Sequence, residues 1–103
     1  MRMMKSDIAK LAESAGEAAR MLRLLANEKR LLVLCALAVK GEASVGELAA
    51  EAGLGMSALS QHLAKLREDG LVATRKEAQT VYYRIDDADA AKILKTLKDI
   101  YCA

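Results

Sequence analysis

The chain has no proline, no tryptophan and only six glycines among its 103 residues. Because helix interiors tolerate proline and glycine least, their scarcity favours a helical fold. Apolar residues make up 53% of the chain and charged residues 29%, a composition typical of globular and not of disordered proteins. A chain this short has a modest core, so we expect a single domain over residues 1–103.

Long apolar runs are missing as well. The N-terminal stretch MRMMKSDIAK carries basic residues, but no apolar segment follows it, so it does not resemble a signal peptide. The chain also has no run of about 18 apolar residues of the kind that crosses a membrane. We therefore expect a cytoplasmic protein without a membrane partner. In that compartment a disulfide is more often a sensing or catalytic event than a permanent cross-link.

Residues that bind metals or perform acid–base chemistry are scarce. The chain has one histidine and two cysteines, Cys35 and Cys102, which lie far apart in the sequence. A tetrahedral zinc site built from them needs carboxylates or a second subunit, so we expect no metal and no other cofactor. The chain lacks a Cys-x-x-Cys motif and an acid–base cluster, which argues against an enzyme. A small thiol oxidoreductase stays open as an alternative.

Helical periodicity accounts for most of the chain. Residues 7–25 and 88–101 each place apolar side chains on one face. Asn27 is a suitable N-cap for a helix over residues 28–39, which is apolar all round and is therefore expected to be buried together with Cys35. The core of one small domain does not cover both terminal helices, so we expect them to pack across a two-fold axis in a homodimer. The alternative is that both fold back on their own subunit.

A helix-turn-helix followed by a hairpin is expected next. Ser44 and Glu47 form a capping-box pattern ahead of the short helix VGELAAEA, and a glycine-containing turn separates it from the helix MSALSQHLAKLRED. The apolar period then changes to that of strands in LVATRK and TVYYRI, which EAQ joins into a hairpin. The predicted fold class is mainly α with a small β-hairpin, a dimeric winged helix-turn-helix. Residues 45–69 form its helix-turn-helix and residues 71–85 its wing.

One helix face has the properties of a surface that reads DNA. Leu59, Leu63 and Leu66 form an apolar stripe on MSALSQHLAKLRED, and small or polar side chains occupy the other side. Such side chains let a helix approach the major groove and bond to base edges and phosphates. The candidates for DNA contact on this helix are Ser57, Ser60, Gln61, His62 and Lys65. His62 flanks the stripe, and we expect a boundary residue with a local hydrogen bond, with a metal ligand or a base reader as the alternatives.

The hairpin supplies further candidates for DNA contact. Arg75 and Lys76 end its first strand, and Gln79 and Thr80 lie at or near its tip. Such side chains suit phosphate or minor-groove contacts. Glu77 reduces the positive charge at the tip, and the alternative is a solvated hairpin with ordinary surface charges. The net charge of +2 neither requires nor excludes DNA binding, because a local cluster of basic residues is sufficient for it.

The segments LANEKRLLVLCAL, SVGELAAEAGLGMSALSQHLAKLREDGLV and TRKEAQTVYYRI resemble the ArsR/SmtB family of bacterial winged-helix repressors. Within that family, ALSQHLAKLREDGLVATRKEAQTVYY resembles the thiol-sensing branch of haemolysin, sulfide-responsive and biofilm regulators. The resemblance implies a homodimer that binds an inverted-repeat operator in double-stranded DNA through Ser57, Ser60, Gln61 and the hairpin tip. Relatives often have Ser-Gln where this chain has Gly55-Met56, which leaves a weaker helix cap and one polar contact fewer.

The resemblance also bears on metals and on the two thiols. Family members that sense metals place cysteines at positions that look like Ala49 and Ala50 here, or use Asp and His residues on the last helix, which here has no histidine. In the thiol-sensing branch, a cysteine pair at positions matching Cys35 and Cys102 reacts with persulfides or other oxidants, becomes cross-linked and lifts repression. The resemblance therefore implies a repressor that a reactive sulfur species or an oxidant switches through a Cys35/Cys102 dithiol.

Other interpretations of the same residues stay open. Cys35 can be an ordinary small core residue and Cys102 an incidental exposed thiol. The protein can also be an anti-silencing activator that displaces a nucleoid protein. Two further possibilities are a DNA binder that does not respond to oxidants and a structural dimer that binds a protein partner.

Overall fold

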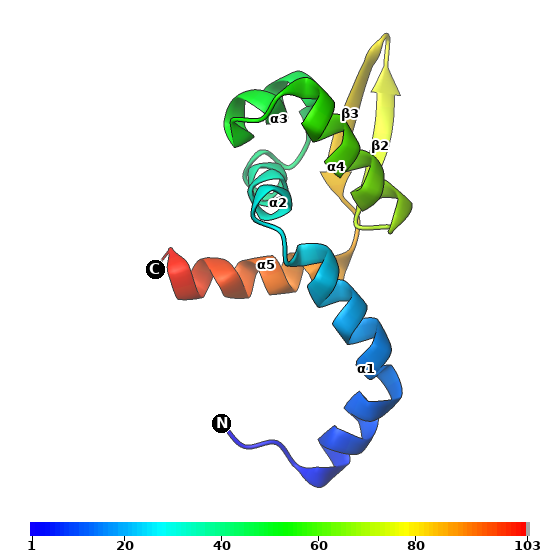
Figure 1. The fold of residues 1–103 in the computed structure, drawn as a ribbon, viewed down its shortest axis with the longest axis vertical. Coiled ribbons are helices and arrows are strands. Elements are labelled where there is room, and N and C mark those ends of the chain that lie inside the picture. The colour runs from blue at the N-terminus through cyan, green and yellow to red at the C-terminus, as the bar shows by residue number, and fades with distance from the viewer. Residues whose placement is uncertain (103) are drawn as a thin grey trace.

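The computed structural model of the protein describes residues 1–102, and Ala103, the last residue of the expected domain, lies outside them. The elements of this part of the chain (Figure 1) are, in order, α1 (Lys5–Leu25), α2 (Glu28–Lys40), β1 (Ala43–Ser44), α3 (Val45–Ala52), α4 (Met56–Glu68), β2 (Val72–Glu77), β3 (Thr80–Ile85) and α5 (Ala88–Tyr101). The order of α3, α4 and the β2–β3 hairpin is that of a winged helix-turn-helix, as predicted. No helix within residues 1–102 combines the length and the apolar content needed to cross a membrane.

The sheet contains one strand more than the sequence indicated. β1 and β2 each pair with β3 in antiparallel orientation, and the strand order β1-β3-β2 places β3 in the centre. The predicted two-stranded hairpin is confirmed as β2 and β3, and β1 is a third strand that the sequence analysis missed. β1 consists of Ala43 and Ser44 alone, and a strand this short has no alternation of apolar and polar residues that could reveal it.

The core lies between α2, α3, α4 and the start of the wing. The largest side chains with less than 2% of their surface exposed are Val33, Leu34, Leu37, Leu48, Leu59, Leu63, Leu66 and Leu71. The predicted leucine stripe of α4 belongs to this set and is confirmed. Each fully buried leucine stabilises the fold by about 1.5–3 kcal/mol. The stripe therefore decides which side of α4 faces the core and which side faces solvent.

The expectation that α2 is buried on all sides is wrong. Leu34 and Leu37 do face the core. On the other side of the helix, Leu32 is 44% exposed and Val39 is 88% exposed, and Cys35 is exposed too. The remaining elements of a subunit this small cover only one side of α2, although its sequence is apolar all round. Cys35 is therefore a surface thiol of the subunit and not a core residue.

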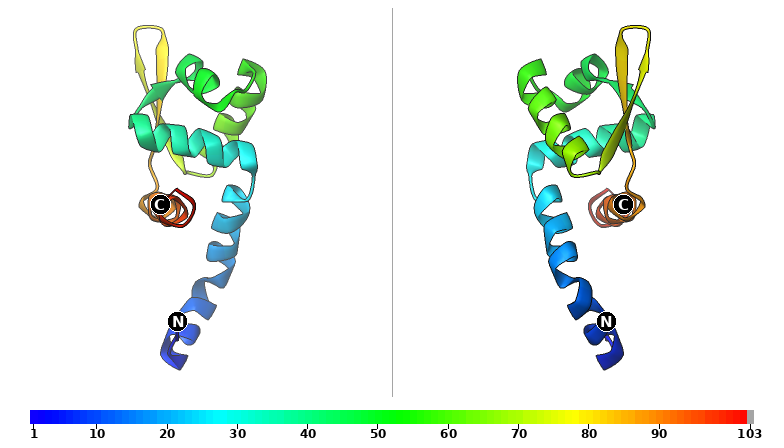
Figure 2. Two further views of the ribbon diagram at one scale, coloured as in Figure 1. Left: turned by 90° about the vertical axis from the view of Figure 1, so that its left-hand side faces the viewer. Right: turned by 90° about the vertical axis from the view of Figure 1, so that its right-hand side faces the viewer.

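α1 extends away from the rest of the subunit. In both side views its N-terminal part points to one end of the molecule, whereas the wing lies at the opposite end (Figure 2). Leu24 and Leu25 at the end of the helix are buried, but Ile8, Leu11 and Leu22 are 48–58% exposed. The subunit measures 51 × 30 × 21 Å, which reflects this extension. Much of the apolar face of α1 has no cover from its own subunit.

Candidate nucleic-acid interface and thiol groove

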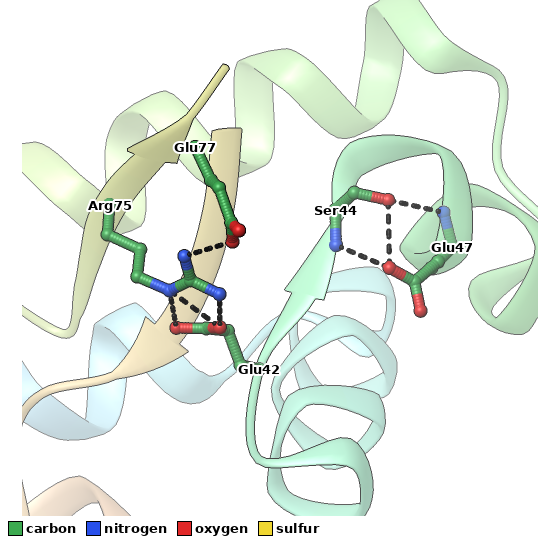
Figure 3. Close-up of polar contacts among 5 residues, drawn as sticks. All are labelled: Glu42, Ser44, Glu47, Arg75 and Glu77. Carbon is green, nitrogen blue, oxygen red and sulfur yellow. Dashed lines mark hydrogen bonds and ion pairs between the residues drawn. The ribbon is translucent and has the colours of Figure 1, made fainter. Parts of the chain in front are cut away.

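Local sequence determines how α3 begins and ends. At its start, the Ser44 hydroxyl accepts a hydrogen bond from the Glu47 backbone N–H at 3.3 Å, and the Ser44 backbone N–H donates to Glu47 Oε1 at 3.1 Å (Figure 3). These bonds confirm the predicted capping box, and the bonds from Ser44 lower the pKa of the Glu47 carboxyl. At its end, Gly53 has a φ of 65°, which glycine adopts without strain. The turn at Gly53 directs the chain into α4.

α4 presents a polar face to solvent. Leu59, Leu63 and Leu66 are fully buried on the opposite side, and His62 is half-buried at the boundary. Among the described residues no side chain caps the start of α4, where Gly55 is the N-cap, so its first backbone N–H groups are available to a partner such as a phosphate. The predicted contact residues exposed on this helix are Ser57, Ser60, Gln61 and Lys65.

Lys65 is partly held by an ion pair. Its Nζ lies 3.3 Å from Oδ2 of Asp69, and Nη2 of Arg20 donates to Oδ1 of the same carboxylate at 3.1 Å. The Asp69 side chain is only 10% exposed and joins the end of α4 to α1, whereas 46% of the Lys65 side chain stays exposed. Lys65 can therefore contact a phosphate either while it stays paired with Asp69 or after this ion pair breaks.

The wing and the helix-turn-helix lie together at the end of the subunit opposite the free end of α1 (Figure 1). At the wing tip, Glu77 pairs with Thr80 across a tight turn in which Ala78 has a φ of 54°. Lys76, Gln79 and Thr80 are exposed, which a contact with DNA requires. The structure thus brings the predicted contacts of the wing tip to the same end of the molecule as α4.

Arg75 has a different environment from the other predicted contacts. Its Nε donates to both carboxylate oxygens of Glu42, at 2.8 and 2.9 Å, and its Nη1 donates to Oε2 of Glu77 at 2.8 Å (Figure 3). The guanidinium carbon lies 4.6 Å from the centre of the Tyr82 ring, within the range of a cation–π contact. The hydrogen bond from Arg75 lowers the pKa of the Glu42 carboxyl, so this carboxylate is ionised at neutral pH.

Sequence patterns did not point to Glu42. It lies 33 positions before Arg75, in the segment KGEA, which the pattern marks only as a helix end. The pairing of β1 with β3 brings Glu42 to the sheet, and no periodic signal announces a strand of two residues.

Cys35 and Cys102 lie on one apolar groove between α2 and α5, with a volume of about 610 Å³. Both are exposed free thiols. Partial desolvation in the groove raises the pKa of the Cys35 thiol, and the charge of Cys102 raises it further. The other residues of the groove include Leu31, Ala38, Val39, Leu94, Leu97, Tyr101 and the lysines Lys95 and Lys98.

The raised pKa of Cys35 predicts how its alkylation depends on pH. The thiolate is the reactive form, so in reduced protein the rate of alkylation by iodoacetamide should reach half its maximum at a higher pH than it does for free cysteine. Cys102→Ser removes the neighbouring charge and should move this midpoint to lower pH, while burial keeps it above that of free cysteine. Mass spectrometry of the Cys35 peptide after timed alkylation measures both shifts. A midpoint that Cys102→Ser leaves unchanged would show that the thiols do not interact.

Comparison with known proteins identifies the family. Residues 27–74, from the N-cap of α2 into β2, match the family described as "Bacterial regulatory protein, arsR family". The transcriptional activator HlyU of Vibrio cholerae is 45% identical to the chain over 96 residues, which are 93% of this chain and 88% of HlyU. This chain belongs to the arsR family.

Solved structures confirm the winged helix-turn-helix fold of this arsR-family chain. Reduced HlyU from Vibrio cholerae aligns with a TM-score of 0.84 at 46% identity and covers 91% of this chain and 98% of its own. The transcriptional repressor BigR from Xylella fastidiosa aligns with a TM-score of 0.84 at 42% identity and covers 98% and 99%. The homodimeric winged helix-turn-helix DNA-binding domain Mb0332 from Mycobacterium bovis aligns with a TM-score of 0.73 at 31% identity and covers 97% and 89%. The protein is a transcriptional regulator and not an enzyme.

The two α3 positions at which the family resemblance implies cysteine ligands offer no metal ligand in this arsR-family chain. Ala49 is half-buried and Ala50 is exposed on α3, and neither has a side-chain donor atom. Across residues 1–102, no three or more His, Cys, Asp or Glu side chains gather into a group that could hold a metal ion. The two candidate functional sites of the described residues are the thiol groove and the polar face of α4.

Proposed function

We propose that this regulator is a homodimeric repressor whose operator affinity is switched by oxidation of a Cys35/Cys102 dithiol. The observation that carries the proposal is that both thiols line one groove between α2 and α5. α2 packs directly against α3 of the helix-turn-helix, and α5 contacts both α2 and β3 of the wing. A covalent bond across the groove therefore acts at the junction between the terminal helix and the DNA-reading elements.

The exposed face of α1 supports the homodimer. Ile8, Leu11 and Leu22 lie on one side of a helix that extends beyond its own subunit, and α5 ends with Ile100 and Tyr101 exposed by 61% and 79%. Apolar faces of this extent are normally covered in the working assembly. The relative Mb0332, which shares the fold, is described as homodimeric.

The polar face of α4 and the wing tip are the proposed DNA-binding surface. A B-form major groove admits one α-helix, and the exposed Ser57, Ser60 and Gln61 have donors and acceptors of the kind that base edges and phosphates bind. Lys76, Gln79 and Thr80 at the wing tip are placed to contact the adjacent backbone or minor groove. Two-fold pairing presents this surface twice, which matches an inverted-repeat operator.

The proposed reaction is a transfer of sulfane sulfur followed by cross-linking. The thiolate of one cysteine attacks the outer sulfur of an organic persulfide R–S–SH, the S–S bond breaks, and the carrier leaves as R–SH. The second thiol attacks the inner sulfur of the resulting cysteine persulfide. A Cys35–Cys102 disulfide forms and hydrogen sulfide leaves, so the dithiol loses two electrons and the transferred sulfur gains them. Hydrogen peroxide leads to the same disulfide through a sulfenic acid, with loss of two water molecules.

Gln61→Ala tests the DNA-binding surface. The amide of Gln61 can donate to and accept from one base edge, so its loss should weaken binding of the reduced protein to its operator by about 1–3 kcal/mol. Fluorescence anisotropy with a duplex selected from random DNA by the reduced wild type measures the affinity. Glu68→Ala, an exposed substitution at the other end of α4, is the matched control and should not weaken binding. Equal affinity of the wild type for selected and unselected DNA would contradict sequence-specific binding.

The description of HlyU as a transcriptional activator favours a second candidate function, an activator that displaces a nucleoid protein from DNA. Both functions use the same DNA-binding surface. Transcription assays with purified components distinguish the repressor from the activator. A repressor lowers transcription from its promoter directly, whereas the activator raises transcription only when a nucleoid protein already occupies the template.

A further inference from the structure

Arg75 spans the sheet from one edge strand to the other. β1 and β2 are neighbours of β3 and not of each other. Ser44 of β1 and Arg75 of β2 both pair with Tyr82 of β3, and the Arg75 side chain passes the Tyr82 ring to reach Glu42, which directly precedes β1. One side chain therefore ties the outer strand of the wing to the turn between α2 and β1 (Figure 3).

The guanidinium of Arg75 is held in a defined orientation. Its Nε and Nη2 edge forms a two-pronged pair with Glu42, in which Nη2 lies 2.6 Å from Oε1, and its Nη1 is bound by Glu77. A two-pronged pair stacked on an aromatic ring is more strongly oriented than an ordinary surface ion pair, which contributes little. We call this set of contacts, from Arg75 to Glu42, Glu77 and the Tyr82 ring, the clamp.

The charge of this cluster opposes contact with DNA. The two carboxylates of Glu42 and Glu77 surround the one guanidinium of Arg75 and give these three groups a net negative charge. Arg84 adds a positive charge near Glu42. The carboxyl pKa of Glu42 is lowered by the Arg75 hydrogen bond, so its charge persists at neutral pH. A phosphate that approaches Arg75 meets repulsion from both carboxylates.

We propose that Arg75 is a positioning residue that fixes the wing relative to the helix-turn-helix through Glu42, and that it does not contact phosphate. β1 continues directly into α3, so the Glu42 turn is continuous with the helix-turn-helix. A wing fixed to this turn keeps its tip at a set distance from the polar face of α4. Both surfaces can then meet one duplex without the entropy cost of ordering the wing on binding. The inference rests on the proposed DNA binding.

Glu42→Ala and Glu77→Ala form a matched pair of tests. Each removes one carboxylate that binds Arg75, so both change the charge of the cluster equally. Only Glu42 joins Arg75 to another element, because Glu77 lies on the same strand as Arg75. In anisotropy titrations of reduced protein with operator DNA, Glu42→Ala should weaken binding by about three- to tenfold. Glu77→Ala should leave it equal or tighter. Equal tightening by both variants would overturn the proposal.

Arg75→Lys separates the two roles of Arg75. Lysine keeps the positive charge but cannot form the two-pronged pair, so a positioning role predicts about the same loss of affinity as Glu42→Ala. A second variant, Arg75→Gln, removes the positive charge. A positioning role predicts that the slope of log K, the logarithm of the operator-binding constant, against log salt is the same in Arg75→Gln as in the wild type. A slope smaller by about one, the value expected for a lost phosphate contact, would show that Arg75 binds DNA directly.

Hydrogen exchange tests the clamp without DNA. Glu42→Ala and Arg75→Lys should accelerate amide exchange in residues 76–81 of the free protein, and Glu77→Ala should not. Unchanged exchange in Glu42→Ala would refute the clamp even if the protein binds its operator. Accelerated exchange in a protein that binds no operator would refute the DNA-binding proposal and leave the clamp intact.

Discussion

Replacing Cys35 by serine should abolish the release of operator DNA that we propose an organic persulfide to cause in the wild type. The Cys35 thiol and Cys102 line one groove, and a cross-link between them needs both sulfurs. The reduced variant should bind operator with wild-type affinity, because the Cys35 side chain is exposed and contributes little to the core. In the wild type, oxidation should weaken binding by about 5- to 150-fold, the range of coupling free energies typical of two-site regulation.

Anisotropy titrations before and after treatment with a persulfide donor measure this effect, and mass spectrometry identifies the cross-linked peptide pair. Cys102→Ser should behave in the same way as Cys35→Ser. Ala38→Ser is a suitable control, since it also lies on the α2 wall of the groove and adds a hydroxyl without removing a thiol. It should release DNA as the wild type does. Release of DNA by either cysteine variant would exclude the dithiol mechanism.

The physical basis of the proposed switch is that α2 contacts both α3 of the helix-turn-helix and the terminal helix α5. α2 packs on α3 through its buried side and carries Cys35 on its exposed side, where the groove separates it from α5. A disulfide requires the Cα atoms of its cysteines to be within about 7 Å. Forming it therefore restricts how α5 sits against α2. If α5 also belongs to the dimer interface, that restriction changes the spacing of the two α4 helices, which the operator half-sites require to be fixed.

Leu22→Glu should convert the protein to a monomer and lower its operator affinity by a factor on the order of 10²–10⁴. Leu22 is 58% exposed on the apolar side of α1, so a charge there does little to the subunit core but disrupts an apolar interface. A monomer engages one half-site at a time and loses the effective concentration that linkage of two binding surfaces supplies. Light scattering combined with size-exclusion chromatography gives the oligomeric state, and anisotropy gives the affinity.

Ser6→Glu is the matched control for Leu22→Glu. It adds the same charge to α1, on the side of the helix away from the apolar residues, and it is exposed. It should leave both the oligomeric state and the operator affinity unchanged. Equal circular dichroism spectra for the two variants establish that the subunits stay folded. A wild type that is monomeric, or a dimeric Leu22→Glu that binds operator normally, would contradict the proposed role of α1.

Much of the fold follows from local patterns in the sequence. The capping box of Ser44 and Glu47, the turn at Gly53 and the leucine stripe of α4 each depend on residues within a few positions of one another, and the structure has all three. Local hydrogen bonds and helical periodicity are sufficient to specify such features, so the helix-turn-helix and the wing were predictable.

The exposure of Cys35 was not predictable in the same way. The sequence of α2 is apolar all round, which predicts apolar surroundings but does not say whether they come from the same subunit or from another molecule. The structure shows that, within a single subunit, the side of α2 that carries Cys35 and Val39 is exposed to solvent. For α1 the small size of the domain did predict that its apolar face lacks cover within the subunit, and the exposed Ile8, Leu11 and Leu22 agree with this.

The sequence by itself determined the order of helices and strands, the polar face of α4 and the presence of two thiols. Only the tertiary structure brought Cys35 and Cys102 to one groove and joined Glu42 to Arg75 across the sheet. The reason is that helical and strand periods are set by neighbouring residues, whereas both pairings depend on the packing of elements far apart in the chain. Whether two distant side chains meet is decided by how those elements pack, which no local pattern encodes.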